Sequence, residues 1–128
     1  MMPDLDWVTA RSKCSGPEVF KRIRAGVFRD LATRNLFPSE PDMIFKMAED
    51  PNPSEDNFKI LRQGHHLEDQ LEFRVEGQRI YVKDGSGERI IDAVSLLNHE
   101  GECRLKVDEQ ELEYWQFCRR ALEEFFRF

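Results

Sequence analysis

The chain has 128 residues, a formal net charge of −6 at pH 7, and a composition that is 40% hydrophobic and 34% charged. This length is typical of one domain, and an aromatic content of 11% is too high for a disordered chain. Binding to a phosphate backbone usually requires a concentrated basic surface, so the acidic balance argues against nucleic acid as a partner. We therefore expect residues 1–128 to form a single globular domain for which nucleic acid is a poor candidate partner.

The three cysteines, Cys14, Cys103 and Cys118, form an odd set without C-x-x-C spacing. This pattern favours reduced thiols and a reducing compartment. The first residues lack the basic start and apolar stretch of a signal peptide, and no apolar run is as long as a membrane span. We therefore expect a cytoplasmic protein that does not associate with a membrane.

A long helix is predicted over residues 16–35. Ser15 can cap its first turn, Pro17 tolerates the lack of an N–H group there, and Glu18 completes a capping box. Apolar residues then recur at helical spacing, namely Phe20, Ile23, Val27 and Leu31. Residues 7–11, which precede this helix, are aromatic and β-branched and predict a strand or an extended arm.

Two weaker segments follow the long helix. Residues 42–49 could form a short second helix with methionines on its inner side. Residues 50–57 are polar and rich in proline, which predicts a surface loop. Loops of this length are often functional or mobile.

The next part of the chain predicts an antiparallel meander of four to five strands. Apolar and charged residues alternate over 71–76 and 102–107, and further strands are expected at 58–62, 79–83 and 89–97. Asp84-Gly85-Ser86-Gly87 is a hairpin turn, and residues 98–101 form another turn. The polar alternate positions predict one covered face and one solvated face of the sheet.

The last helix is predicted to begin after Asp108, with Glu111 at the capping-box position. Its apolar positions include Trp115, Phe117, Leu122 and Phe125, so we expect it to cover the sheet. The fold class is therefore α+β, a two-layer sandwich of an N-terminal helix, the meander, and a C-terminal helix packed on one face of the sheet.

The metal-ligand candidates are His65, His66, Glu68 and His99. If residues 64–69 are extended, the two adjacent histidines point to opposite faces, and His66 and Glu68 share one face without an obvious third ligand. His99 could join them only if the two turns lie at the same end of the meander. A polar turn between strands is the alternative interpretation.

No motif for nucleophilic catalysis is present, because there is no G-x-S-x-G and no defensible pairing of cysteine with histidine. Cys14 precedes the start of a helix, where a thiolate is favoured, and is the best candidate for a reactive thiol. No cofactor motif is present either.

Three phenylalanines, Phe125, Phe126 and Phe128, lie within the last four residues. One helical stripe cannot easily bury all of them, so they predict a contact with a partner or a homodimer interface. Burial within the monomer explains them equally well.

These features favour a non-enzymatic protein-binding or adaptor module that uses the solvated sheet face or the C-terminal phenylalanines. The alternative is a small metal- or ligand-binding enzyme that uses the turn at His65 and His66. A third hypothesis is weak nucleic-acid binding through the basic face of the helix at 16–35, because residues 1–34 carry seven Lys/Arg and four Asp/Glu.

Overall fold

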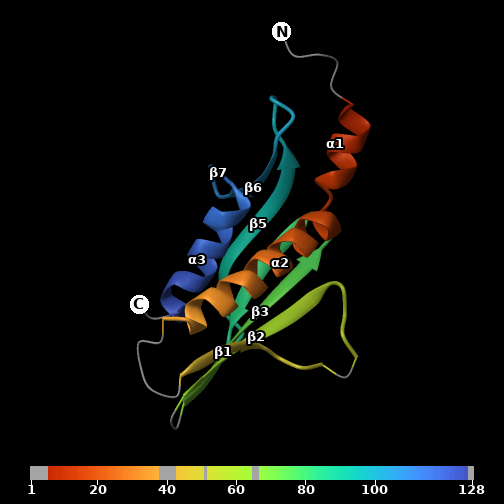
Figure 1. The fold of residues 1–128 in the computed structure, drawn as a ribbon. Coiled ribbons are helices and arrows are strands. Elements are labelled where there is room, and N and C mark those ends of the chain that lie inside the picture. The colour runs from red at the N-terminus through yellow and green to blue at the C-terminus, as the bar shows by residue number, and fades with distance from the viewer. Residues whose placement is uncertain (1–5, 38–42, 51, 65–66, 127–128) are drawn as a thin grey trace.

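A computed structural model describes residues 6–37, 43–50, 52–64 and 67–126. These residues form an α+β fold with N-terminal helices, a seven-stranded antiparallel sheet, and a C-terminal helix (Figure 1). The elements are α1 (Trp7–Lys13), α2 (Gly16–Asn35), β1 (Ile44–Met47), β2 (Asn57–Gly64), β3 (Leu67–Glu76), β4 (Arg79–Asp84), β5 (Arg89–Leu97), β6 (Cys103–Val107), β7 (Gln110–Leu112) and α3 (Tyr114–Phe126). The spatial order of the strands is their order in the chain.

The prediction of four to five strands is wrong because two short edge strands were missed. Residues 44–47, expected in a helix, form β1 and pair with β2. Asp108, expected to cap the last helix, instead has a positive φ of 53° between β6 and β7. The last helix begins six residues later, at Tyr114, because residues 110–112 first pair with β6.

Helix α2 has the predicted bounds, and its first turn has the predicted cap. The Glu18 N–H donates to Ser15 Oγ at 3.4 Å. Gly16 is required where the helix begins, because a Cβ atom there would lie 1.8 Å from the Gly77 carbonyl oxygen. The preceding segment is helix α1 rather than a strand, and it buries none of its residues.

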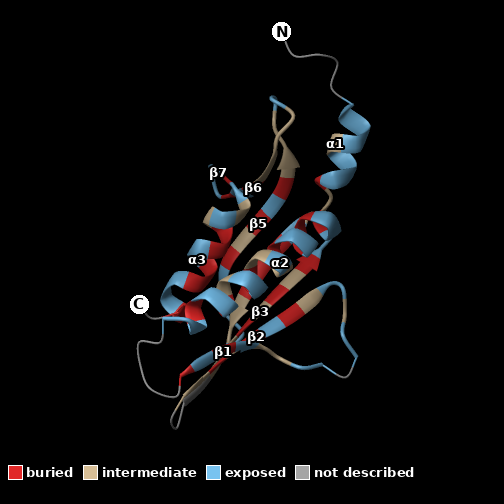
Figure 2. Cartoon of the chain, in the orientation of Figure 1, coloured by how far each residue is buried: buried red, intermediate tan, exposed pale blue. Residues whose placement is uncertain are grey.

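Helices α2 and α3 lie side by side on one face of the sheet (Figure 1). Their buried sides face the sheet and their outer sides are exposed, as Figure 2 shows. The core between the layers includes Phe20, Phe58, Phe73 and Phe117. The Phe58 and Phe73 rings stack at 4.7 Å between centroids, which joins β2 to β3.

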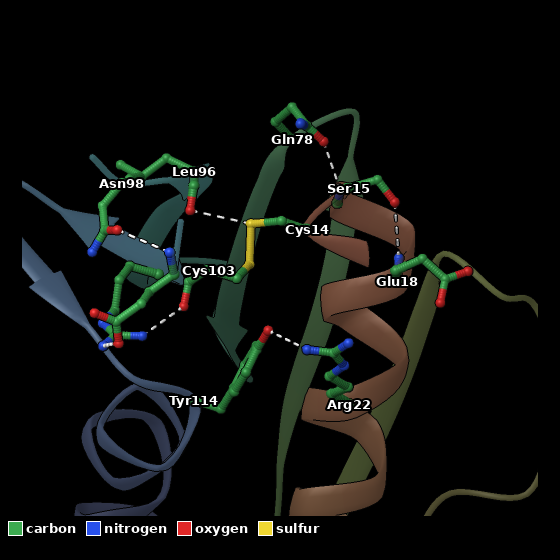
Figure 3. The surroundings of a disulfide bond; sticks show 12 residues. Cys14, Ser15, Glu18, Arg22, Gln78, Leu96, Asn98, Cys103 and Tyr114 are labelled. Atoms are coloured by element: carbon green, nitrogen blue, oxygen red, sulfur yellow. Dashed lines mark hydrogen bonds and ion pairs between the residues drawn. A yellow bond between two sulfur atoms is a disulfide. The ribbon is translucent and has the colours of Figure 1, made fainter. Parts of the chain in front are cut away.

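Cys14 and Cys103 form a disulfide, so the expectation of three reduced thiols is wrong (Figure 3). The two residues are 89 positions apart in the chain, and their Cα atoms lie 5.5 Å apart. The disulfide ties the junction of α1 and α2 to β6. Cys14 Sγ also lies 3.1 Å from the Leu96 carbonyl oxygen. This contact is not a hydrogen bond, because a disulfide sulfur carries no proton. The prediction of a cytoplasmic location relied in part on three reduced cysteines. The disulfide removes that argument, and the location stays a prediction.

Two buried arginines cap the C-terminal end of α3. Arg62 donates to the Phe125 carbonyl at 2.9 Å, and Arg34 donates to the Phe126 carbonyl at 2.7 Å. The last carbonyls of a helix have no partner within it, and they carry the negative end of its dipole. The arginines therefore satisfy these carbonyls and hold the end of α3 against α2 and β2.

Asn35 covers the open edge of β1. Its side-chain amide donates to the Phe45 carbonyl at 2.8 Å and accepts from the Phe45 N–H at 3.0 Å. One side chain thus makes both hydrogen bonds that a neighbouring strand would make there. This arrangement protects an edge that could otherwise pair with another chain.

Candidate functional site

The structure gives no support to a metal centre among the residues it describes, since no three His, Cys, Asp or Glu side chains there are grouped closely enough to hold an ion. His65, His66 and the side chain of Glu68 lie outside the described residues. His99 is exposed in the turn after β5. Strands alternate in direction along the meander, so this turn and the strand ends at Gly64 and Leu67 lie at opposite ends of the sheet.

The cysteines do not offer a reactive thiol in this structure. Cys14 is in the disulfide, and Cys118 is a buried free thiol. Burial raises the pKa of Cys118 to about 12. A thiol with that pKa is protonated at neutral pH and is a poor nucleophile.

Two of the three C-terminal phenylalanines are buried within the chain. Phe125 and Phe126 are 5% and 6% exposed, and both rings pack edge-on against Phe45. The burial of these two residues agrees with the alternative interpretation, packing within the monomer, because β1 covers them. Phe128 lies outside the described residues.

The exposed aromatic surface lies instead between the outer sides of α2 and α3. There Trp115 is 56% exposed and Phe37 is 70% exposed. Both line a largely apolar groove of about 390 Å³, together with Asp30, Cys118 and Leu122. We call this depression the Trp115 groove.

A second hollow of about 570 Å³ adjoins the Trp115 groove, because Asp30, Trp115 and Cys118 line both. Its walls are fixed by a contact between the helices, in which Arg22 donates to the Tyr114 hydroxyl at 2.8 Å. Figure 3 shows these two side chains pointing toward each other from α2 and α3. The two hollows therefore form one trough along the outer junction of the helices.

Asp30 is the chemically distinctive group of the trough. It lies between the two hollows and has no hydrogen bond or ion pair with any described residue. Burial raises the pKa of Asp30, and the neighbouring Arg29 opposes that effect. By contrast, Arg119 pairs with Glu123 at 3.4 Å. Asp30 is thus a half-buried carboxylate, partly compensated by Arg29, beside an exposed indole.

The sequence pattern did not identify Trp115 as a surface residue. The spacing of Trp115 from Cys118 and Leu122 matches the buried stripe of α3. Trp115 itself lies on the side of that stripe nearest α2. Its indole N–H donates to Glu113 Oε2 at 2.8 Å, at the solvent-exposed start of the helix. Only the position of α2 shows that this side remains open.

Comparisons of the chain with protein-family models, curated proteins and solved structures found no match. Within the described residues, no helix is both long enough and apolar enough to cross a membrane. Any function must therefore be argued from the surfaces themselves.

Proposed function

We propose that this chain is a non-enzymatic protein-binding module whose Trp115 groove takes an apolar segment of a partner protein that carries a lysine or arginine. The observation that carries the proposal is the exposed Trp115 indole beside the unpaired Asp30 carboxylate. An apolar side chain of the partner would cover Trp115. Its cation would pair with Asp30 and contact the indole face.

Three further features support a cationic partner segment. The chain has a net charge of −6, which attracts basic segments over a distance. The groove is largely apolar, so a charge pair within it is less screened than one on an open surface. Aromatic residues are also enriched among the residues that dominate binding energy at protein interfaces.

The test uses a designed amphipathic helix of leucine and lysine as the probe, with tryptophan fluorescence and anisotropy as the readouts. We expect Trp115→Ala and Asp30→Asn each to weaken binding. The matched control is Phe28→Ala, because Phe28 is 64% exposed on α2 and lines neither hollow. Replacement of the probe's lysines by glutamates should also abolish binding.

Equal weakening by Phe28→Ala and Trp115→Ala would refute a specific groove, and equal binding of the glutamate probe would refute the role of Asp30. Native mass spectrometry addresses self-association. A dimer near twice 15.2 kDa that disappears in Trp115→Ala would identify a second copy of the chain as the partner.

A further inference from the structure

The face of the sheet turned away from α2 and α3 is a second surface with a different charge. The strand register aligns its side chains in rows that run across the strands. One row is Asn57, Arg74, Tyr81 and Asp92, the next is Lys59, Glu72, Lys83 and Arg89, and a third is Glu76, Arg79, Val94, Lys106 and Glu111. We call these thirteen positions the outer rows.

The outer rows carry six basic and four acidic residues, a net charge of +2, although the whole chain carries −6. Glu111 lies opposite Lys106 on the neighbouring strand, and the other three acids have partners within the rows. Glu76 accepts from the Tyr81 hydroxyl at 2.8 Å, Asp92 pairs with Arg89 at 2.9 Å, and Glu72 lies 3.9 Å from Arg74.

Three lysines of the outer rows lack such partners. Lys59, Lys83 and Lys106 have no carboxylate within 4.0 Å among the described residues. The excess positive charge of this face is therefore not neutralised by the chain's own ion pairs.

A β-bulge adds a basic residue to this face. Val82 pairs with Ile91 and Lys83 pairs with Arg89, which leaves Ile90 unpaired. Arg89 and Ile91 are two positions apart, so in an unbroken strand both would face the helices. The bulge turns Arg89 to the outer face, in keeping with the tendency of bulges to re-aim side chains at functional positions.

The bulge also places two positive charges directly opposite each other, Lys83 on β4 and Arg89 on β5. Opposed like charges destabilise a sheet. Both lie over the ring of Tyr81, with the Arg89 guanidinium 3.8 Å and the Lys83 ammonium 5.7 Å from its centroid. The Tyr81 ring and the ion pair of Arg89 with Asp92 offset part of this repulsion, and an anion bound beside Lys83 would offset more of it.

We propose that the outer rows bind an acidic segment of a protein partner, with Lys59, Lys83 and Arg89 receiving its carboxylates. Lys59 and Lys83 are separated by one strand, so their backbones are about 10 Å apart. Lys83 and Arg89 lie on adjacent strands. An extended acidic segment crossing the strands would meet all three cations in one row, with an uncharged residue of the segment over Glu72, which lies between Lys59 and Lys83.

The charge pattern favours an acidic polypeptide over a nucleic acid. Glu72, Glu76 and Asp92 interrupt the basic positions, and a continuous phosphate backbone would pass close to each of them. A polypeptide can instead place carboxylates opposite the cations and uncharged residues opposite the acids. The net charge of −6 further repels a long polyanion.

This surface lies across the sheet from the Trp115 groove, so the inference does not depend on the proposed function. The probe is a short, labelled peptide in which glutamates are separated by uncharged residues, with anisotropy measured at low and at physiological salt. We expect binding that weakens with salt, as exposed charge pairs do. The double variant Lys59→Gln/Lys83→Gln should raise the Kd about three- to tenfold, the effect of losing two exposed ion pairs.

The matched control is Lys13→Gln/Lys21→Gln, which removes the same charge from exposed positions on α1 and α2. It should leave the Kd nearly unchanged. An equal loss in this control would show non-specific attraction and overturn the proposal. Tighter binding of a single-stranded oligonucleotide of matched length, or no binding of the glutamate-containing peptide at low salt, would also overturn it.

Discussion

Reduction of the Cys14–Cys103 disulfide is expected to destabilise the fold strongly. The bond closes a loop between residues separated by 89 positions. In the chain-entropy treatment, a loop of this length restricts the unfolded chain by about 4.6 kcal/mol at 25 °C. Domains have total stabilities of about 5–15 kcal/mol, so reduction should remove a third or more of the unfolding free energy.

Urea denaturation with and without a phosphine reductant measures this effect directly. The midpoint should fall on reduction while the cooperative transition remains, because the core between the layers does not depend on the bond. Thiol labelling of the denatured protein gives an independent readout. One cysteine should label before reduction and all three after it, since Cys118 is the free thiol.

Two variants sharpen the test. Cys103→Ala should unfold at the same midpoint with or without reductant, whereas Cys118→Ala should keep the reductant effect of the wild-type chain. Labelling of three cysteines in the denatured unreduced protein would show that the bond does not form, and a wild-type midpoint that does not move on reduction would refute the expected stabilisation.

Three further predictions concern single side chains. Arg62→Met should lower the unfolding free energy measured in urea by about 3 kcal/mol, because it leaves the buried Phe125 carbonyl without its charged donor. The control is Arg120→Met at an exposed position, which should change the unfolding free energy by less than about 0.5 kcal/mol. Asn35→Leu should cost about 1 kcal/mol and, by opening the edge of β1, cause concentration-dependent association in light scattering; a monodisperse variant would contradict the edge-covering role. Asp30 has a raised pKa in the folded state, so its ionisation opposes folding increasingly as the pH rises through that pKa. Asp30→Asn should therefore be more stable than the wild-type chain at neutral pH and equal to it at low pH, and the same gain at both would refute the assignment.

The parts of the fold that local sequence determines were predicted well. The bounds of helix α2 are predictable because its cap, Ser15, directly precedes the helix and its four regularly spaced apolar residues lie within it. The turn at Asp84-Gly85-Ser86-Gly87 was found for the same reason. The Asp84 carboxylate accepts from the Ser86 N–H at 2.9 Å, so the turn stabilises itself.

The missed elements depend on distant partners. Strand β1 has only four residues, too few for a period-2 pattern to separate it from a helical turn. It is held by β2 and by Asn35. Asp108 and Glu111 are spaced as in a capping box, but pairing of Leu112 with Leu105 extends the sheet through that segment and delays the helix.

The candidate site was not predictable for a similar reason. The exposure of Trp115 is set by the distance between α2 and α3, which no local pattern encodes. The pairing of Cys14 with Cys103 likewise requires β6 to lie beside the start of α2. The terminal phenylalanines were assigned to an interface because β1, which buries two of them, was missing from the predicted sheet.

The edges of the sheet help to decide how this protein can meet a partner. On one edge the Asn35 amide already occupies the outward N–H and C=O groups of Phe45, and on the other β7 has only three residues. Addition of a partner strand is therefore disfavoured at both edges. The proposed partners would then meet the faces, where the helical layer has the Trp115 groove with the Asp30 carboxylate and the sheet layer has the lysines of the outer rows. The two surfaces prefer ligands of opposite charge and lie on opposite sides of the core, so both could be occupied at once. Variants of the Trp115 groove should therefore weaken binding of the leucine and lysine probe alone. Variants of the outer rows should weaken binding of the acidic probe alone.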